Sequence, residues 1–427
     1  MDDILIHGRT QEEHDVRLHQ TLKKIQAAGL TLNKDKCVFS KTSVKFLGQV
    51  IDSDGIRPDP DKIKAIHDVQ EPQNVSDIRR FLGMVNQLSK FSPRISDKMR
   101  PLCELLSKNN QWCWGESQKM AFKEVKTMLT SSPVLALFDP SLATTVSADA
   151  SSFGLGAVLL QTQKSGELRP IAYASRAMTP ADVQYAQIEK EVLTLTWACE
   201  KFSDYLVGLK FHIFTDHKPL VPLLSTKRLD ELPLRVQRFR LRLMRYYFTI
   251  SHVPGKDMTI PDALSRAPST EATLNDKGFQ DEVNAYVNVV IKNLPASQHR
   301  IQQIRKHQEE DAVLRQVSKF CYGGWPDVKN IPNGIKLYHS VSSELSVEKG
   351  LLLHGSQIVI PHSLQAEIIA QVHRGHQGIT KCRERARQCV WWPGLSAQLE
   401  EVVRRCRTCC KEQLQRSARA TYGIFFT

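Results

Sequence analysis

The sequence predicts a multidomain α/β protein, in which a domain with a mixed α/β sheet is flanked by helical units. Strand-like segments in residues 131–267 are followed by a helix and a further strand, a succession typical of a mixed sheet. Residues 61–130 carry apolar side chains at helical spacing. His and Cys residues gather near the carboxyl end, where we expect a small helical metal-binding unit. The length of 427 residues suits several domains, because one domain takes about 100–200 residues.

The composition favours a globular protein that binds a polyanion. Charged residues make up 24% of the chain and hydrophobic residues 41%, which argues against wholesale disorder. The 58 Lys and Arg exceed the 45 Asp and Glu, so nucleic acid is favoured as partner ahead of an acidic membrane. The chain has neither an apolar run long enough for a bilayer nor a start typical of a signal peptide. We therefore expect an intracellular protein, cytoplasmic or nuclear, with reduced cysteines and no membrane partner.

The elements are predicted in chain order. Residues 1–60 mix short helical and strand signals, and the stretch VKFLGQVI indicates half of a hairpin. The helical unit that follows has a buried stripe predicted at Ile78, Phe81, Leu82, Val85 and Leu88. In the central domain we expect a long helix over about 184–206, and strands at 144–148, 156–160, 170–175 and 211–215. Beyond it we expect a linker and a helix over 268–335, with the polar linker at 268–290 and the helix at 298–320, and a last unit over 336–415 that opens with a hairpin.

Several acids of the central domain are placed to meet. Asp149 and Asp216 each end a strand-like segment, and Asp262 follows a Pro-Gly turn. A helix is predicted between the first two acids. With a rotation of 100° per residue, Glu191 leans toward the sheet and Glu189 faces water. Converging carboxylates repel each other unless divalent cations lie between them, and two Mg²⁺ ions could then activate a water for phosphodiester hydrolysis. The alternative is that these are solvated surface and cap acids, and spacing alone leaves both open.

The same acids lie in four ordered motifs, DASSFGLGAVL, YAQIEKEVL, FTDHKPL and HVPGKDMTIPDALSR. Together these motifs resemble the ribonuclease H domain of gypsy-type LTR retrotransposon Pol polyproteins. The resemblance implies a ribonuclease H-like fold and Mg²⁺-dependent cleavage of the RNA strand of RNA–DNA hybrids. It implies that Asp149, Glu191 and Asp216 are metal-ligating catalytic acids, and that Asp262 matches a fourth acid. Relatives carry a mobile His loop before that acid, whereas here only Val253 separates His252 from Pro-Gly and the loop is shortened.

The beginning of the chain resembles another part of the same polyprotein. Asp2 and Asp3 resemble the paired acids of a reverse transcriptase palm, and LTLNKDKCVF, VKFLGQVIDSDGIRPDPDKI and DIRRFLGMVNQLSKF resemble the palm end and thumb. The resemblance implies a truncated palm over 1–60 and thumb or connection helices over 61–130. A third palm Asp and the fingers region have no counterpart in the sequence. We therefore expect Asp2 and Asp3 to be relics of a polymerase site, with no DNA synthesis by this chain alone.

Near the carboxyl end, two His and two Cys have the spacing of zinc ligands. His373 and His376 are separated by two residues, as are Cys406 and Cys409. Two imidazoles and two thiolates suit one tetrahedral Zn²⁺, which would supply folding energy to a small unit. Cys410 is a near-ligand that could compete with Cys409. The alternative is a basic helix pair with incidental His and Cys.

The run VHRGHQGITKCRERARQCVWWPGLSAQLEEVVRRCRTCC resembles the zinc-binding amino-terminal domain of retrotransposon integrases. The resemblance implies that this unit helps to hold integrase multimers and DNA ends, with other retroelement proteins as partners. The integrase catalytic core has no counterpart in the sequence, so we expect no strand transfer by this polypeptide. The sequence does not predict the oligomeric state.

Two basic runs are candidates for contact with a phosphate backbone. Seven Lys and Arg against two acids lie between Lys227 and Arg245, and eleven against four lie between Gln371 and Ala420. A merely solvated basic face is the alternative for each run. The favoured function is ribonuclease H-type cleavage of RNA–DNA hybrids. The alternatives are a catalytically inert, zinc-containing remnant that binds nucleic acid, or the product of a damaged gene.

Overall fold

The structure, a computed structural model, describes residues 3–8, 10–88, 91–92, 95–106, 112–130, 134–266, 268 and 272–410. The chain divides into two units, which are described separately below. One unit holds residues 1–143 and 159–173, and the other holds 144–158 and 174–427. Among the described residues, none of the helices combines the length and the apolar character that crossing a bilayer requires.

The first unit begins with helix α1 (Gln11–Ala27), which has no buried residue. An antiparallel sheet follows, in the order β1 (Ser43–Phe46), β2 (Gln49–Asp52) and β3 (Gly55–Pro58). The stretch that we expected to be half of a hairpin thus contains the two strands β1 and β2. Leu47 and Gly48 between them have positive φ angles of 49° and 72°. Such a two-residue turn matches the twist of the strands that it joins, so a hairpin forms within the short stretch.

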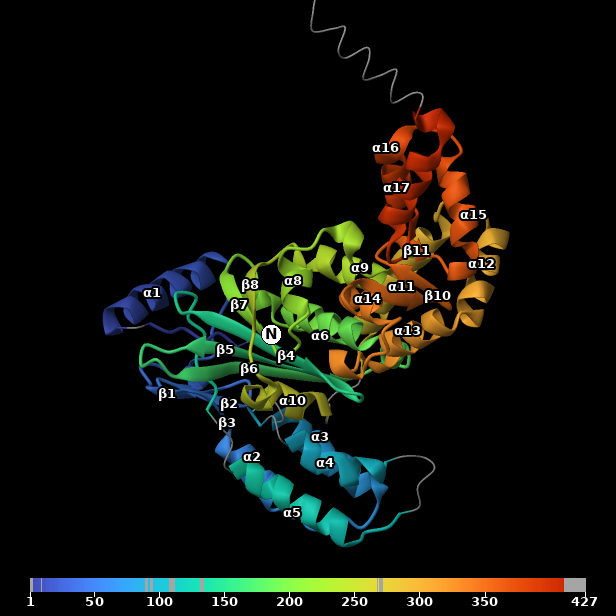
Figure 1. The fold of residues 1–427 in the computed structure, drawn as a ribbon. Helices are drawn as coiled ribbons and strands as arrows, with labels where there is room; N and C mark the ends of the chain where they lie inside the picture. Colours follow the sequence, from blue (N-terminus) through green and yellow to red (C-terminus); the bar gives the residue numbers. More distant parts are fainter. Residues whose placement is uncertain are drawn as a thin grey trace, which may run out of the picture. The chain divides into compact units, whose positions relative to one another are not determined.

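The expected helical unit is present in the first unit of the structure (Figure 1). Its predicted stripe is buried, with Ile78, Phe81 and Val85 fully covered. The ring of Phe81 lies 4.6 Å from that of Phe122 on the last helix, so the stripe faces a core that the helices share. The helices are α2 (Pro60–His67), α3 (Val75–Leu88), α4 (Ile95–Glu104) and α5 (Glu116–Thr130).

The largest sheet of the described residues has five strands, in the order β6-β5-β4-β7-β8. Strand β7 runs parallel to both β4 and β8, and the short turns that join β4, β5 and β6 permit only antiparallel pairing, so the sheet is mixed. The strands are β4 (Thr144–Ala150), β5 (Gly154–Thr162), β6 (Leu168–Ala177), β7 (Lys210–Thr215) and β8 (Tyr247–His252). All four predicted strands lie within β4 to β7. Strand β8 was not predicted, because this edge strand has no buried residue to give it an apolar pattern.

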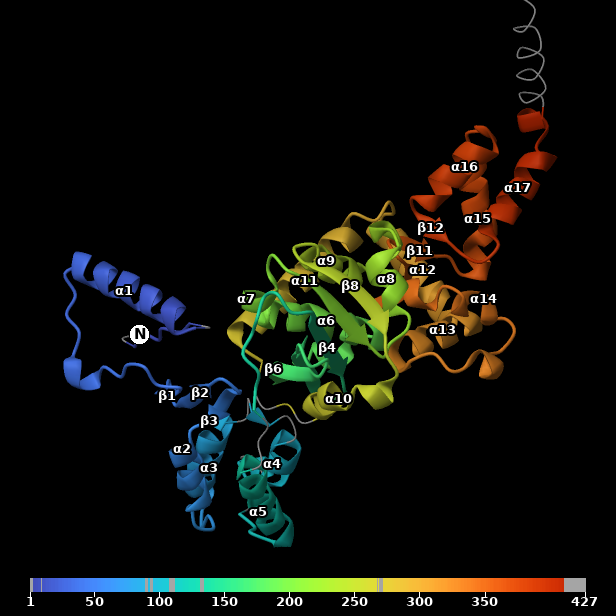
Figure 2. The same cartoon turned by 90° about the vertical axis from the view of Figure 1, so that its left-hand side faces the viewer.

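Helices cover both faces of strand β4. Helix α6 packs on one face and α10 on the other, which explains why every residue of β4 is buried (Figures 1 and 2). Residues 191–199 of α6 are all buried, as expected for a helix enclosed on several sides. The predicted long helix is divided at Phe202. The helices of this domain are α6 (Gln187–Lys201), α7 (Ser203–Leu206), α8 (Leu220–Ser225), α9 (Leu234–Leu243) and α10 (Thr259–Arg266).

A packed helix occupies much of the segment where we expected a polar linker. Helix α11 (Leu274–Lys292) begins at Thr273, whose side chain accepts a hydrogen bond from the Asp276 N–H. Asp276 also forms an ion pair with buried Arg176. The helix is polar on its exposed side, but a regular stripe of four apolar residues packs it onto the protein. These buried residues are Phe279, Val283, Val287 and Ile291.

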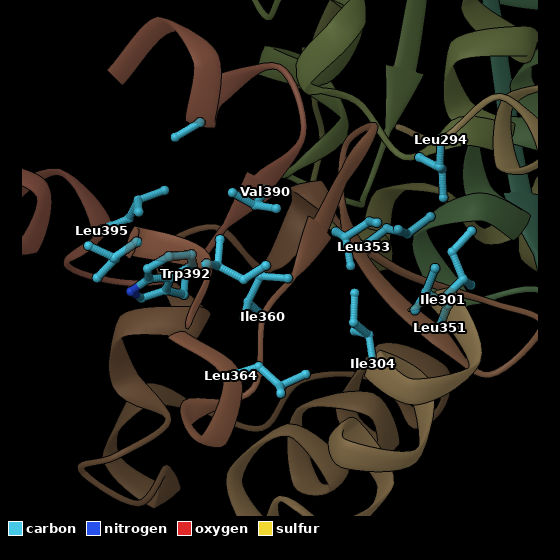
Figure 3. Close-up of a cluster of buried hydrophobic side chains, with 14 of the residues drawn as sticks. Leu294, Ile301, Ile304, Leu351, Leu353, Ile360, Leu364, Val390, Trp392 and Leu395 are labelled. Carbon is cyan, nitrogen blue, oxygen red and sulfur yellow. The ribbon is translucent and has the colours of Figure 1, made fainter. Parts of the chain in front are cut away.

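The carboxyl-terminal part combines helices with a small sheet in the order β12-β11-β10-β9. The predicted helix at 298–320 is two helices, because Asp311 caps a new helix at this point. Strand β12 pairs in parallel with β11, so Trp392, just after β12, is buried among Ile360, Leu364 and Leu395 (Figure 3). The helices are α12 (Gln298–Glu310), α13 (Ala312–Gly323), α14 (Lys336–His339), α15 (His362–His373), α16 (Gly378–Arg387) and α17 (Leu395–Arg405), and the strands β9 (Leu345–Glu348), β10 (Leu351–His354), β11 (Gln357–Val359) and β12 (Val390–Trp391).

Candidate active site and zinc centre

Three of the predicted acids meet beside strand β4. Asp149 lies near the end of β4, Glu191 lies in the second turn of α6, and Asp216 directly follows β7. One ligand oxygen from each carboxylate lies within 4.8 Å of the others. Asp149 and Glu191 are buried and Asp216 is exposed, so the group opens to solvent on one side. The parallel pairing of β4 with β7 brings the ends of these two strands, and therefore their acids, together.

Neutral side chains hold the two buried carboxylates. The Ser265 hydroxyl lies 2.8 Å from Asp149 Oδ2, and Gln187 Nε2 donates to Glu191 Oε1 at 2.6 Å. Sequence reasoning missed both residues. Gln187 lies one helical turn before Glu191, which was a usable signal. Ser265 is remote from Asp149 in sequence, and only tertiary structure brings them together.

The electrostatics of the site favour cation binding. Burial, and then the charges of Asp149 and Asp216, raise the pKa of Glu191 to about 8. Burial likewise raises the pKa of Asp149, while the hydrogen bond from Ser265 opposes that rise. Carboxylates with raised pKa values are ionised more easily when a cation lies between them. Mg²⁺ prefers oxygen ligands, and two oxygens bound to one Mg²⁺ ion lie about 4 Å apart or closer. The ligand oxygens here lie within 4.8 Å of one another, so small rotations of the side chains would bring them to that separation.

Asp262 does not join the group of three. Its carboxylate lies in the first turn of α10 and accepts a hydrogen bond of 2.7 Å from Arg266 Nε. Its charge still contributes to raising the pKa of Asp149, so it lies within electrostatic reach of the site. His252 ends β8, and the turn that follows lies against the site. A Cβ atom placed on Gly255 would be 3.1 Å from Asp216 Oδ2.

The expectation that Glu189 faces water was wrong. Its side chain is 2% exposed, and Arg235 Nη1 lies 3.3 Å from its Oε2. The same guanidinium lies 2.6 Å from Glu348 Oε1 and 4.7 Å from the ring of Tyr185. Glu189 is covered because helix α9 packs on α6 and brings Arg235 to it, and the same Arg235 pairs with Glu348 of strand β9.

The basic run at 227–245 is largely neutralised within the chain. Arg238 and Arg242 both pair with Glu282 of α11, and Arg242 also pairs with Glu200. The remaining partners are Glu344 for Lys227, Asp230 for Arg228, and the carbonyl groups of Leu223 and Lys227 for Arg240. Most positive side chains of the run therefore bind acids of this chain. Few of them are left to contact a phosphate backbone, as the sequence had predicted for the run.

The predicted zinc ligands form the second group. His373 ends α15, His376 lies in the loop before α16, and Cys406 and Cys409 follow α17. Cys406 Sγ is 3.2 Å from His376 Nδ1, and Cys409 Sγ is 3.2 Å from His373 Nε2 and 3.8 Å from His376 Nδ1. Tetrahedral Zn²⁺ with bonds of about 2.0–2.3 Å would hold its ligands about 3.3–3.8 Å apart. The four side chains thus form a zinc-binding group.

The pKa shifts of Cys406 and His373 suit metal binding, whereas burial raises the pKa of the Cys409 thiol. The backbone N–H of Cys409 lowers the pKa of the Cys406 thiol to about 7. Burial, and then neighbouring His376, lower the pKa of His373, which favours the neutral imidazole that a metal needs. Cys410, expected as a competitor, instead directs its thiol to the carbonyl of Arg404 at 3.1 Å.

Of the two acids at the start of the chain, Asp2 and Asp3, the structure describes Asp3. Asp3 is exposed and lies in no helix or strand. Asp2 lies outside the residues that the structure describes. Their interpretation as relics of a polymerase site stays a prediction.

Three family models match separate parts of the chain. Residues 1–51 match the reverse transcriptase (RNA-dependent DNA polymerase) family, and residues 114–213 match the RNase H-like domain found in reverse transcriptase. Residues 360–415 match the integrase zinc-binding domain. The second match includes Asp149 and Glu191, and the third includes all four zinc-binding residues.

Curated relatives match almost the whole chain. The Tf2-3 and Tf2-4 transposon polyproteins of Schizosaccharomyces pombe are each 30% identical to it over 418 residues, which is 96% of this chain. The match spans 30% of the length of each polyprotein. The chain therefore corresponds to less than a third of these relatives.

Solved structures of foamy viral protease-reverse transcriptase are also similar. The one in complex with RNA/DNA hybrid is 22% identical, with a TM-score of 0.47, and the match covers 58% of this chain and 34% of that one. The one in complex with dsDNA is 22% identical, with a TM-score of 0.46, and the match covers 58% and 52%. In order, this chain matches the end of a reverse transcriptase, an RNase H-like domain found in reverse transcriptase and an integrase zinc-binding domain, and over almost its whole length it is similar to retrotransposon polyproteins.

Proposed function

We propose that the RNase H-like domain cleaves the RNA strand of RNA–DNA hybrids in a Mg²⁺-dependent reaction. The observation that carries this proposal is the group formed by Asp149, Glu191 and Asp216, whose ligand oxygens lie within 4.8 Å of one another. The match of this region to the RNase H-like domain found in reverse transcriptase also supports hydrolysis. The alternative, solvated surface acids, does not suit Asp149 and Glu191, because both are buried.

Each acid has a role in the proposed reaction. Asp149, Glu191 and Asp216 would hold two Mg²⁺ ions, which when bound activate a water and stabilise the leaving oxygen of the phosphodiester. Exposed Asp216 faces the side from which a phosphate can approach. We assign Asp262 a supporting role as the fourth acid, because its charge, on helix α10, contributes to raising the pKa of Asp149.

The substrate class follows from the same chemistry. Cleavage of phosphodiesters by a metal-carboxylate site does not require base contacts, so we expect little sequence preference. Distinction of the RNA strand then rests on its 2′-hydroxyl groups and on helix geometry. Because most of the basic run at 227–245 is paired internally, hybrid binding should depend on other basic residues.

The decisive experiment uses the purified chain and a hybrid labelled in its RNA strand. Asp149→Asn should lower Mg²⁺-dependent cleavage about 100-fold or more while leaving hybrid binding nearly intact. Asp204→Asn, at an exposed acid on α7, is the matched control and should cleave like the wild type. Salt-sensitive binding of the hybrid without Mg²⁺-dependent cleavage by the wild type would reject the proposal and favour a binding module.

A further inference from the structure

Ser265 is a fully buried polar residue in direct contact with the carboxylate group. It is 0% exposed, and its Oγ lies 2.8 Å from Asp149 Oδ2 and 2.9 Å from the Asp262 carbonyl oxygen. A hydroxyl has only one proton to donate. An ionised carboxylate is the stronger acceptor, so the proton belongs mainly to the bond with Asp149.

Close packing between α10 and β5 places this hydroxyl. A Cβ atom on Gly156 would lie 2.3 Å from the Pro261 carbonyl oxygen and 2.4 Å from the Ser265 nitrogen, so the helix backbone touches the strand. The Ser151 hydroxyl also donates to the Ser265 carbonyl at 2.6 Å. Ser265 is therefore held by backbone contacts on a regular helix, with little freedom to move away from Asp149.

We propose that Ser265 is a positioning residue, whose hydroxyl fixes the Asp149 carboxylate in the orientation in which it shares cations with Glu191 and Asp216. This inference rests on the proposed function. Gln187 holds Glu191 in the same manner at 2.6 Å, so each buried carboxylate has one neutral hydrogen-bond donor. A neutral donor orients a carboxylate without cancelling the charge that attracts a cation, which a Lys or Arg in its place would do.

The test measures Mg²⁺ binding as well as cleavage, in the full chain. Ser265→Ala should raise the half-saturating Mg²⁺ concentration about tenfold, by calorimetry and in the cleavage assay, because residues that orient metal ligands contribute about 10- to 100-fold to affinity. At saturating Mg²⁺ most of the cleavage rate should return. Ser265→Cys, with its weaker donor, should fall between Ala and Ser.

A control separates positioning from general stability. Thr196→Val removes another fully buried hydroxyl, which donates to the Val192 carbonyl at 2.8 Å. It should lower the melting temperature while leaving Mg²⁺ affinity at the wild-type value. Equal Mg²⁺ affinity in Ser265→Ala and the wild type would overturn the positioning role, as would equal losses of Mg²⁺ affinity in Ser265→Ala and Thr196→Val.

Failure of the proposed function gives a different result. If the wild type neither binds Mg²⁺ in a manner sensitive to Asp149→Asn nor cleaves the hybrid, the hydrolase itself is rejected, and the role of Ser265 with it. If the wild type does both and Ser265→Ala matches it throughout, only the positioning role is rejected.

Discussion

The guanidinium of Arg235 donates a hydrogen bond of 2.6 Å to the carboxylate of Glu348, a residue 113 positions further along the chain. The same group lies 3.3 Å from Glu189, two residues before the proposed metal ligand Glu191. Glu189 and Glu348 are 2% and 1% exposed. Strand β9 is thus joined to the helix that carries part of the candidate site.

Replacing Arg235 should destabilise the protein strongly. Arg235→Ala leaves two buried carboxylates without a cation, which typically costs about 3–5 kcal/mol. We expect a large fall in the urea-unfolding midpoint, and partial recovery when Glu189→Gln and Glu348→Gln are added. Arg228→Ala, which breaks an exposed pair with Asp230, should leave the midpoint nearly unchanged. Similar midpoints for the two single variants would show that the buried network does not stabilise the fold.

Replacing two glycines by alanine should have opposite effects on stability, because Gly156 lies at the contact between β5 and α10 and Gly278 has open space around it. Gly156→Ala forces a methyl group to within 2.3–2.4 Å of backbone atoms of Pro261 and Ser265, and should destabilise by about 1–3 kcal/mol or more. Gly278→Ala, inside the second turn of α11, places a Cβ atom that has nothing within 4 Å and should stabilise by about 0.5–1 kcal/mol. Thermal unfolding of both variants tests the pair, and a neutral Gly156→Ala would mean that the helix can move away from the strand.

Mg²⁺ binding should depend steeply on pH. The pKa of Glu191 is raised from 4.5 to about 8 in the metal-free protein, so a proton must leave when a cation binds. Affinity should therefore increase by up to about tenfold per pH unit below pH 8 and level off above it. Calorimetric titrations from pH 6 to 9 measure this, and Glu191→Gln should flatten the profile. A half-saturating Mg²⁺ concentration that is the same at pH 6 and pH 8 contradicts the prediction.

The same shift predicts the stability of the metal-free protein. A carboxyl group with a raised pKa binds its proton more tightly in the folded state. Its contribution is fully present below pH 4.5 and is lost as the pH rises through about 8. Urea unfolding in the presence of a chelator should thus show a lower midpoint at pH 8.5 than at pH 6, with a smaller difference in Glu191→Gln. Equal pH dependence in the wild type and in this variant would assign the effect to other groups.

The zinc centre should hold one ion through Cys406 but not through Cys410. Cys406→Ser removes a thiol of the His-Cys group, so zinc content should fall and amide exchange in α15 and α17 should quicken. Cys410→Ser is the control, because that thiol bonds to the Arg404 carbonyl. Atomic absorption and hydrogen exchange measure both effects, and an equal loss of zinc in the two variants would mean that Cys410 is a ligand.

Local sequence patterns predicted many elements correctly. The stripe Ile78, Phe81, Val85 repeats at helical spacing and is buried in α3. Strand β8 was missed because it is an edge strand without a buried residue, and helix α11 because its polar residues were taken for a linker despite the stripe from Phe279 to Ile291. The domain boundaries at 60, 130, 267 and 335 stay a prediction.

The candidate sites divide in the same way. Two His and two Cys at short, regular spacing carry their chemistry in the sequence itself, and the four residues lie together. The motifs identified Asp149, Glu191 and Asp216, but they could not predict the distances between the three carboxylates. Ser265, Glu189 and Arg235 show the limit, because their partners lie on distant segments.

By itself, the sequence determined most of the elements and which side chains can bind metals, because periodicity, turns and ligand spacing act over a few residues. The tertiary structure alone decided which distant groups meet: Ser265 with Asp149, and Arg235 with Glu189 and Glu348. The physical reason is that burial and close approach depend on how helices cover the sheet. Burial and the approach of Asp149 and Asp216 likewise raise the pKa of Glu191, and contacts between distant segments pair Arg242 of the basic run with Glu200.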